Sequence, residues 1–103
     1  MDQNISISYA ITASTEHAEL ENLLTLLVKL KRDIDEIVVQ VDSDTATQQV
    51  RNVSNPSVEF IEFSLNNHFG NFKNNLKSHC SKDYIFQIDA DETANTSLIK
   101  LLA

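Results

Sequence analysis

The segment Asp89-Ala90-Asp91-Glu92 places two carboxylates two positions apart, directly after the β-rich run Tyr84 to Ile88. Carboxylate oxygens are hard ligands that suit Mg²⁺ or Mn²⁺, and these ions commonly keep water molecules and bind substrate phosphates. The same segment also suits the start of a helix, where Asp91, Glu92 or Thr93 would cap the first turn. The residues alone therefore indicate either a divalent-metal site or a helix cap.

A second polar cluster begins at Asp42, after the β-branched run Ile37 to Val41. A carboxylate at the end of a strand can accept hydrogen bonds from a nucleoside base or ribose. It can equally form an Asx-turn, or cap the helix expected after Thr45. Asp44 carries the same two interpretations.

Lys73 is the third candidate, because it follows the single glycine, Gly70, in the first turns of a predicted helix. A cation is an unusual choice near a helix N-terminus, so Lys73 is a candidate for binding an anion such as a diphosphate. A solvated lysine on an exposed helix face is the alternative. His68, in the loop before Gly70, is a candidate ligand contact, whereas Cys80 is expected in the core because no His or acid stands beside it in a nucleophile pattern.

Composition limits the classes of function that these residues can serve. The chain has 103 residues, 42% hydrophobic and 22% charged, which is typical of one globular domain spanning 1–103. The net charge of −7 disfavours nucleic acid and anionic membrane surfaces, although a divalent cation can reverse the sign locally for a phosphate ligand. One cysteine fits a reducing, cytoplasmic compartment, and no apolar run is long enough to span a membrane.

Hydrophobic periodicity predicts strands that alternate with helices. The expected strands are Ile5 to Ile11, Ile37 to Val41, Val58 to Phe63 and Tyr84 to Ile88. The expected helices are His17 to Arg32, Ala46 to Val53, Asn71 to Ser81 and Thr96 to Leu102, with a polar loop from Asn66 to Gly70. This order predicts an α/β, Rossmann-like three-layer sandwich with a mostly parallel four-stranded sheet.

Three polar clusters follow strands of this predicted sheet, at Thr12 to Glu16, Asp42 to Thr45, and Asp89 to Glu92. In open parallel sheets, ligands bind beyond the carboxyl ends of the strands, near the point where the strand order reverses. We therefore expect the three clusters to converge on one ligand site.

Taken together, these segments resemble the nucleotide-binding half of family 2 glycosyltransferases, which have the GT-A fold. Asp35 to Ser43 is similar to the family stretch DEIVVVDSGS, with one extra residue here. Phe69 to Asn74 is similar to the FGxxKN segment of the bacterial lipopolysaccharide-core branch. Asp83 to Glu92 resembles GDYILFLDADE, which contains the DXD motif of the family, and Ile5 to Glu16 corresponds to its first strand and the following loop.

The resemblance implies a role for each matching position around the nucleoside. Asp42 would contact the uracil or other base, while Ala10, Ile11 and Thr12 would line the nucleoside pocket, partly through backbone groups. Lys73, followed by Asn74, would approach the base or the diphosphate.

The DXD segment carries the remaining implied roles. Asp89, with Ala90 beside it, would approach the ribose or the donor sugar. Asp91, with Asp89, would hold the Mn²⁺ or Mg²⁺ ion that bridges the diphosphate and stabilises its charge as it leaves. Glu92 is the carboxylate nearest to this motif, and the resemblance does not assign it as a catalytic base.

By this resemblance we expect a minimal glycosyltransferase that binds UDP-glucose or a related UDP-hexose with a divalent metal and transfers or hydrolyses the sugar. Relatives continue past the DXD strand into an acceptor subdomain, whereas this sequence ends at Ala103, so donor hydrolysis is an expected activity. The alternatives are a catalytically inactive nucleotide-sugar-binding module and a truncated fragment of a longer glycosyltransferase. The family's glycine after VDS is replaced by Asp44. A homo-oligomer is expected, since the surface that relatives bury under the acceptor subdomain would be exposed.

Overall fold

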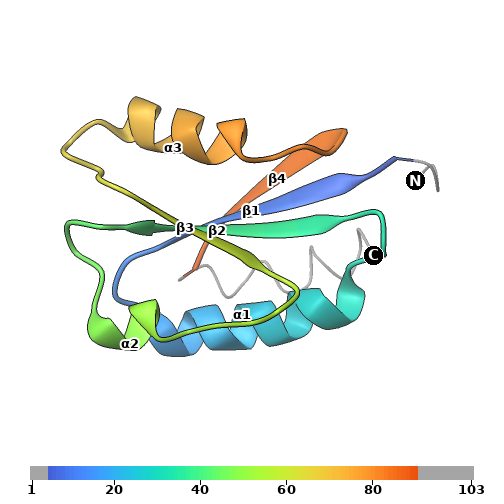
Figure 1. The fold of residues 1–103 in the computed structure, drawn as a ribbon, viewed down its shortest axis with the longest axis horizontal. Helices are drawn as coiled ribbons and strands as arrows, with labels where there is room; N and C mark the ends of the chain where they lie inside the picture. The colour runs from blue at the N-terminus through green and yellow to red at the C-terminus, as the bar shows by residue number, and fades with distance from the viewer. Residues whose placement is uncertain (1–4, 91–103) are drawn as a thin grey trace.

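Strands and helices alternate along the chain in a computed structural model, which describes residues 5–90 (Figure 1). The elements are β1 (Ile7–Ala13), α1 (His17–Leu30), β2 (Glu36–Asp42), α2 (Gln48–Arg51), β3 (Glu59–Phe63), α3 (Phe69–Ser78) and β4 (Tyr84–Asp89). The expected final helix, Thr96 to Leu102, lies outside the described residues. No helix within residues 5–90 has the length and apolar character needed to cross a membrane.

The strands form one sheet in the order β3-β2-β1-β4, and every neighbouring pair is parallel. Helices α1 and α2 lie on one face of the sheet and α3 lies on the other (Figure 1). The predicted α/β, Rossmann-like three-layer arrangement with a parallel four-stranded sheet is confirmed.

The larger core lies between the sheet and α1. Leucines three and four positions apart form the buried stripe of that helix, as expected for an amphipathic helix: Leu20, Leu23, Leu24 and Leu27. Alternate residues of β1 face this stripe, since side chains two positions apart in a strand share a face: Ile7, Tyr9, Ile11 and Ala13. The residues between them, including Ala10 and Thr12, therefore face α3.

The core beneath α3 is smaller and consists of Ala10, Val38 and Leu76, with Cys80 half-buried against it. A polar contact supplements these apolar ones. Gln40 is fully buried, its Nε2 donates to the carbonyl oxygen of Phe72 at 2.7 Å, and its Oε1 accepts from Nδ2 of Asn75 at 2.7 Å. Gln40 therefore fastens α3 to the middle of the sheet.

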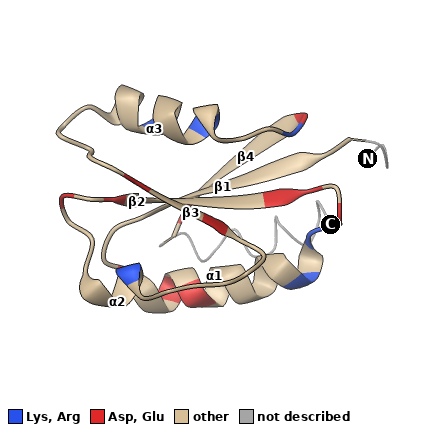
Figure 2. Cartoon of the chain, viewed as in Figure 1, with Lys and Arg blue, Asp and Glu red and all other residues tan. Residues whose placement is uncertain are grey.

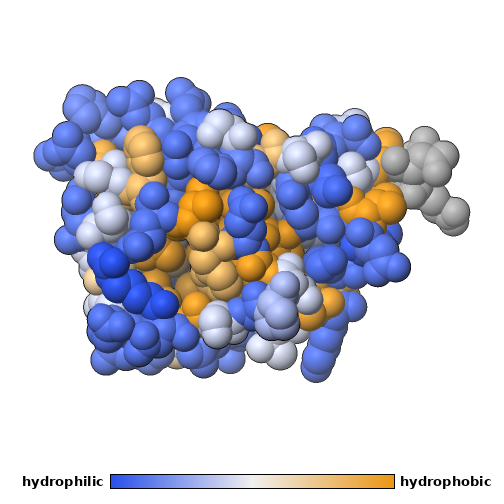
Figure 3. Space-filling view, in the orientation of Figure 1, coloured by the Kyte–Doolittle hydropathy of each residue, from blue (hydrophilic) through white to orange (hydrophobic). Residues whose placement is uncertain are grey.

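The outer edge at β3 is partly apolar. Figure 3 shows apolar side chains gathered in the middle of the face that Figure 1 presents. A hollow of about 200 Å³ at this edge is lined by residues of β2, α2 and β3 and by Val53. Nη1 of Arg51 pairs with Glu62 at 2.6 Å across it, so a partly exposed ion pair covers part of the apolar surface.

A buried carboxylate joins the amino-terminal ends of β1 and β2. The Asp35 side chain is 1% exposed and pairs with the Arg32 guanidinium, whose Nη2 lies 3.0 Å from Oδ1. Its oxygens also accept hydrogen bonds from the backbone N–H groups of Ile7 and Arg32, each at 2.9 Å. Burial raises the pKa of Asp35, but the hydrogen bonds from Arg32 and Ile7 outweigh burial and hold that pKa below its usual range.

Two element boundaries differ from the sequence prediction in ways that affect the site. The first strand extends through Thr12 and Ala13, which pair with Gln40 and Val41 of β2, although polar Thr12 was expected in a loop. Helix α3 begins at Phe69, not Asn71, and ends at Ser78, not Ser81.

The early start of α3 follows from the backbone just before it. Asn66 and Asn67 adopt positive φ angles of 44° and 59°, a conformation that asparagine tolerates, so the chain turns within two residues. The Phe72 N–H then donates to the His68 carbonyl at 3.0 Å. Gly70 consequently lies in the first turn of the helix and not in the loop.

Replacing the buried carboxylate by an amide (Asp35→Asn) is expected to lower the free energy of unfolding at neutral pH by about 1–3 kcal/mol, because one acceptor becomes a donor facing other donors. A depressed pKa gives stability that is present above the unfolded value of about 3.9 and is lost as the pH falls through the folded value. The difference between wild type and Asp35→Asn in urea denaturation should therefore shrink on acidification. A difference that stays constant down to about pH 3 would contradict this, and exposed Asp33→Asn is the control.

Candidate functional site

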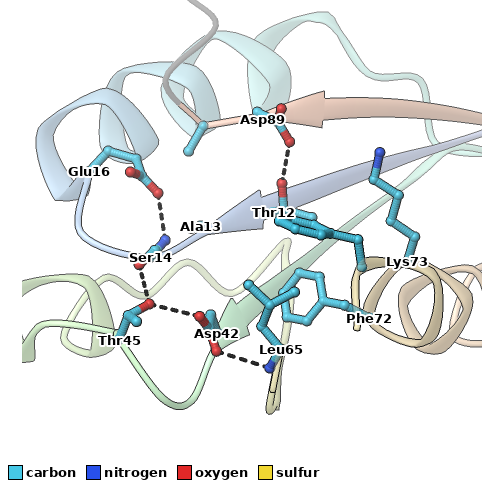
Figure 4. Close-up of a pocket in the computed structure, with 12 residues that line it drawn as sticks. Thr12, Ala13, Ser14, Glu16, Asp42, Thr45, Leu65, Phe72, Lys73 and Asp89 are labelled. Carbon is cyan, nitrogen blue, oxygen red and sulfur yellow. Dashed lines mark hydrogen bonds between the residues drawn. The ribbon is translucent and has the colours of Figure 1, made fainter. Parts of the chain in front are cut away.

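A pocket of about 410 Å³ lies at the carboxyl ends of β1, β2 and β4 (Figure 4). The strand order reverses here, since β2 and β3 lie on one side of β1 and β4 lies on the other. Ligands of open α/β sheets bind at such a reversal, and the volume is within the range of small-molecule sites. The described lining residues are Thr12, Ala13, Ser14, Glu16, Asp42, Thr45, Leu65, Phe69, Phe72, Lys73, Asp89 and Ala90.

The ends of β1 and β4 are joined at the inner part of the pocket. Thr12 lies opposite Asp89 in the parallel register, and its Oγ1 donates to Oδ1 of Asp89 at 2.5 Å. The Ala90 N–H donates to the Thr12 carbonyl oxygen at 2.9 Å. The Thr12 hydroxyl proton is therefore used within the protein, and its oxygen faces the pocket as an acceptor.

Asp42 joins the turn after β2 to the loop after β3. Its Oδ1 accepts from the backbone N–H groups of Asp44 and Leu65, each at 3.1 Å, and its Oδ2 accepts from Oγ1 of Thr45 at 2.8 Å. The bond to Asp44 forms the Asx-turn that the sequence offered as an alternative. Burial raises the pKa of Asp42, but the hydrogen bonds from Thr45, Asp44 and Leu65 outweigh burial and hold that pKa below its usual range.

A chain of hydroxyl groups extends from Asp42 across the pocket wall (Figure 4). Oγ1 of Thr45, which donates to Asp42, is itself hydrogen-bonded to Oγ of Ser14. The Ser14 N–H donates to Oε1 of Glu16 at 2.5 Å, so the Glu16 side chain turns back onto the loop before α1 and does not cap that helix. These contacts fix the loop after β1 against the loop after β2.

The opposite wall is apolar and comes from the loop after β3 and the first turn of α3. It is formed by Leu65, Phe69 and Phe72, and Phe69 is 67% exposed. The Phe72 ring packs against Phe63, with ring centroids 6.4 Å apart, and its carbonyl is held by Gln40. The pocket therefore has one polar wall and one aromatic wall.

Negative charge dominates the described lining. Glu16, Asp42 and Asp89 contribute carboxylates, and Lys73 contributes an ammonium group from the α3 side. Figure 2 shows acidic residues at both ends of β2, and the carboxyl end is the one that meets the pocket. An anionic ligand would be repelled here unless a cation accompanied it.

The structure brings together five of the residues that the sequence singled out. Thr12, Asp42, Lys73, Asp89 and Ala90 all line the pocket.

The other predicted residues lie elsewhere. Ala10 and Ile11 are fully buried in the central strand β1, with side chains on opposite faces and a paired strand on each side, and neither residue lines the pocket. Asn74 is exposed on α3 outside the described lining, as is His68 at the start of that helix. Asp91 and Glu92 lie outside the described residues.

Several lining residues were not singled out individually from the sequence. Ser14, Glu16 and Thr45 belong to the polar clusters expected at strand ends, but sequence spacing does not tell which side chains of a loop turn inward. Leu65, Phe69 and Phe72 are apolar, and the three-residue spacing of the two phenylalanines on one helix is the signal that could have placed them together.

Comparison of the chain with protein-family models, curated proteins and solved structures gave no match. Within residues 5–90, no cluster of three His, Cys, Asp or Glu residues is arranged to hold a metal ion.

Gln40→Leu is expected to loosen α3 and with it the aromatic wall, because both polar contacts of the buried amide disappear. We expect a loss of about 1–3 kcal/mol in unfolding free energy and faster amide hydrogen exchange in α3 than in α1. Asn75→Ala, which removes only one of the two bonds, is the matched control and should have the smaller effect. Unchanged exchange in α3 of Gln40→Leu would show that Gln40 does not hold the helix.

Proposed function

We propose that the protein binds a nucleotide sugar, UDP-glucose or a related UDP-hexose, together with a divalent cation, and transfers or hydrolyses the sugar as a glycosyltransferase. One observation carries the proposal. Thr12, Asp42, Lys73 and Asp89 belong to segments far apart in the chain, each selected for nucleotide chemistry, and they line one pocket at the reversal of strand order.

The charge of the pocket supports a requirement for a cation. Three carboxylates and one ammonium group give the described lining a formal charge of −2, from 1 minus 3, which disfavours a bare diphosphate. A hard divalent ion commonly uses one or two carboxylates and completes its shell with water and substrate phosphates, and the exposed carboxylate of Asp89 suits it in kind. When bound, such an ion supplies the positive charge that stabilises the diphosphate as it leaves. Asp91 would be its second ligand.

The α3 side of the pocket would hold two parts of the donor, the diphosphate and one face of the base. Figure 4 shows Lys73 on the α3 side, across from Ser14 and Thr45, with Asp89 at the end of β4. The ammonium group of Lys73 suits the diphosphate, while the aromatic wall beside Phe72 suits the flat face of the base.

A binding module without catalysis is the second candidate. Glu16, Asp42 and Asp89 each accept a hydrogen bond from the protein itself, as carboxylates that hold loops together do. This observation favours a structural use of these groups over use as a general base. Release of UDP from a UDP-hexose over time separates the two candidates, since the module would bind without turnover.

UDP is expected to bind in the presence of Mn²⁺ and to lose binding when EDTA removes the ion. Lys73→Ala should weaken this binding about tenfold, because it removes the ammonium group that faces the diphosphate. Isothermal calorimetry with UDP and UDP-glucose measures both effects. Lys77→Ala, one turn further along α3 and outside the pocket, is the matched control and should bind as wild type. Absence of any UDP binding with Mn²⁺ would overturn the proposed function.

A cytoplasmic location and a homo-oligomer also stay predictions. Ile85 of edge strand β4 is 39% exposed and next to Tyr84, which is 60% exposed. We expect this surface to be buried between copies, so Ile85→Lys should give a smaller particle in light scattering, because a lysine on an edge strand opposes pairing. Ile34→Lys, at a site 40% exposed between α1 and β2, is the matched control. A monomeric wild type at micromolar concentration would contradict the prediction.

A further inference from the structure

We propose that Ser14 Oγ is a specificity-determining hydrogen-bond acceptor, which makes the pocket select a planar base with an N–H donor on a ring nitrogen, as uracil has at N3 and cytosine does not. The inference rests on the proposed function and goes beyond it, because it names the group that reads the base and the kind of base that it accepts. It assigns to Asp42 a positioning role, in which Asp42 acts on the ligand through Thr45 and Ser14.

Asp42 carries a charged carboxylate. This carboxyl accepts two backbone N–H groups and one hydroxyl, and these bonds favour its charged form over the neutral one. A charged carboxylate has no proton to donate. Three of its roughly four acceptor positions are filled from within the protein, so little of it remains for a ligand.

The charge of Asp42 determines which group donates in each hydrogen bond from Asp42 through Thr45 to Ser14. Since Asp42 can only accept, Thr45 must donate its single hydroxyl proton to Oδ2 of Asp42. The bond between Thr45 and Ser14 is then made with the other hydroxyl proton available, that of Ser14. The Ser14 hydroxyl therefore donates toward Thr45.

Ser14 has no hydrogen-bond donor left for a ligand. Its N–H donates to Glu16 at 2.5 Å, and its carbonyl oxygen accepts from the Thr47 N–H at 3.2 Å. With the hydroxyl proton given to Thr45, both donors of the residue are used. The side-chain oxygen retains lone pairs, and Ser14 lies on the pocket lining. Ser14 can therefore offer a ligand an acceptor and no donor.

The aromatic wall determines the shape of the group that Ser14 meets. Leu65, Phe69 and Phe72 form an apolar surface on the other side of the pocket, and such a surface suits the face of a flat heterocycle. A ring lying against this wall would direct its edge at the polar wall. A ring N–H at that edge pairs with Ser14, whereas a ring nitrogen with a lone pair meets another lone pair.

Thr12 presents an acceptor in the same way but lies in a different part of the pocket. Its hydroxyl donates to Asp89, beside the proposed place of the cation and the sugar. The base is therefore assigned to the side of Ser14 and Thr45, and sugar hydroxyl groups, which are donors, suit the side of Thr12 and Asp89.

The test measures the binding of three probes, each with Mn²⁺, by calorimetry: UDP, CDP and UDP methylated at N3 of uracil. Wild type should bind UDP roughly three- to tenfold more tightly than either other probe, because each lacks the N3–H donor. Ser14→Ala should weaken UDP by the same factor and leave the N3-methyl probe unchanged.

Thr45→Val tests the direction of the Ser14 hydroxyl without removing Ser14 itself. This variant keeps the shape of the side chain but frees the Ser14 hydroxyl to donate, so the preference for UDP over CDP should fall toward unity. Ser43→Ala, at a neighbouring hydroxyl outside the described lining, should behave as wild type. Urea denaturation of each variant establishes that it is folded.

The outcomes separate this inference from the proposed function. If UDP binds wild type and Ser14→Ala equally, or if Thr45→Val keeps the full preference for UDP over CDP, the role of Ser14 is wrong and nucleotide binding stands. If wild type binds none of the three probes, the role of Ser14 and the proposed function are both wrong.

Discussion

The parallel pairing of β1 with a strand on each side is the constraint on which the rest of the structure depends. Parallel neighbours end at the same edge of a sheet, so Thr12 is fixed between Gln40 of β2 and Asp89 of β4. Each connection must also cross a face of the sheet. The chain reaches β2 and β3 on one side of β1 and returns to β4 on the other, which places α3 on the face opposite α1 (Figure 1). The gap at this reversal becomes the pocket.

Because successive strand residues point to opposite faces of the sheet, the two faces have different roles. Odd-numbered residues of β1 bury their side chains under α1, where the larger core forms. Even-numbered residues face α3, and the last of them, Thr12, reaches the pocket together with Asp42 and Asp89. Because this face carries polar groups, its apolar core is small and α3 needs the buried amide of Gln40. Stability thus comes mainly from one face and the candidate site from the other.

Much of this arrangement could be predicted from the sequence, because strand and helix periods are local signals. The leucine stripe of α1 and the β-branched run of β2 predicted their elements within about two residues. Strand order and loop contacts depend on residues far apart in the chain, and periodicity carries no information about them. Asp42 illustrates this limit. Its place at the end of a strand was predicted, but its hydrogen bond from the Leu65 N–H joins positions 23 residues apart, which no local pattern indicates.

The acidic residues show how place in the fold decides the use of one chemical group. Asp35, at the amino-terminal edge, is enclosed by donors from Arg32 and Ile7 and has no acceptor left for a ligand. Asp42, at the carboxyl edge, is nearly as saturated, yet its one hydroxyl partner, Thr45, is bonded in turn to Ser14, whose oxygen is left as an acceptor on the pocket lining. Acceptors therefore dominate the polar side of the pocket. Under the proposed function, N–H groups of the base, sugar hydroxyls and a divalent cation supply the donors and the positive charge that such a lining favours.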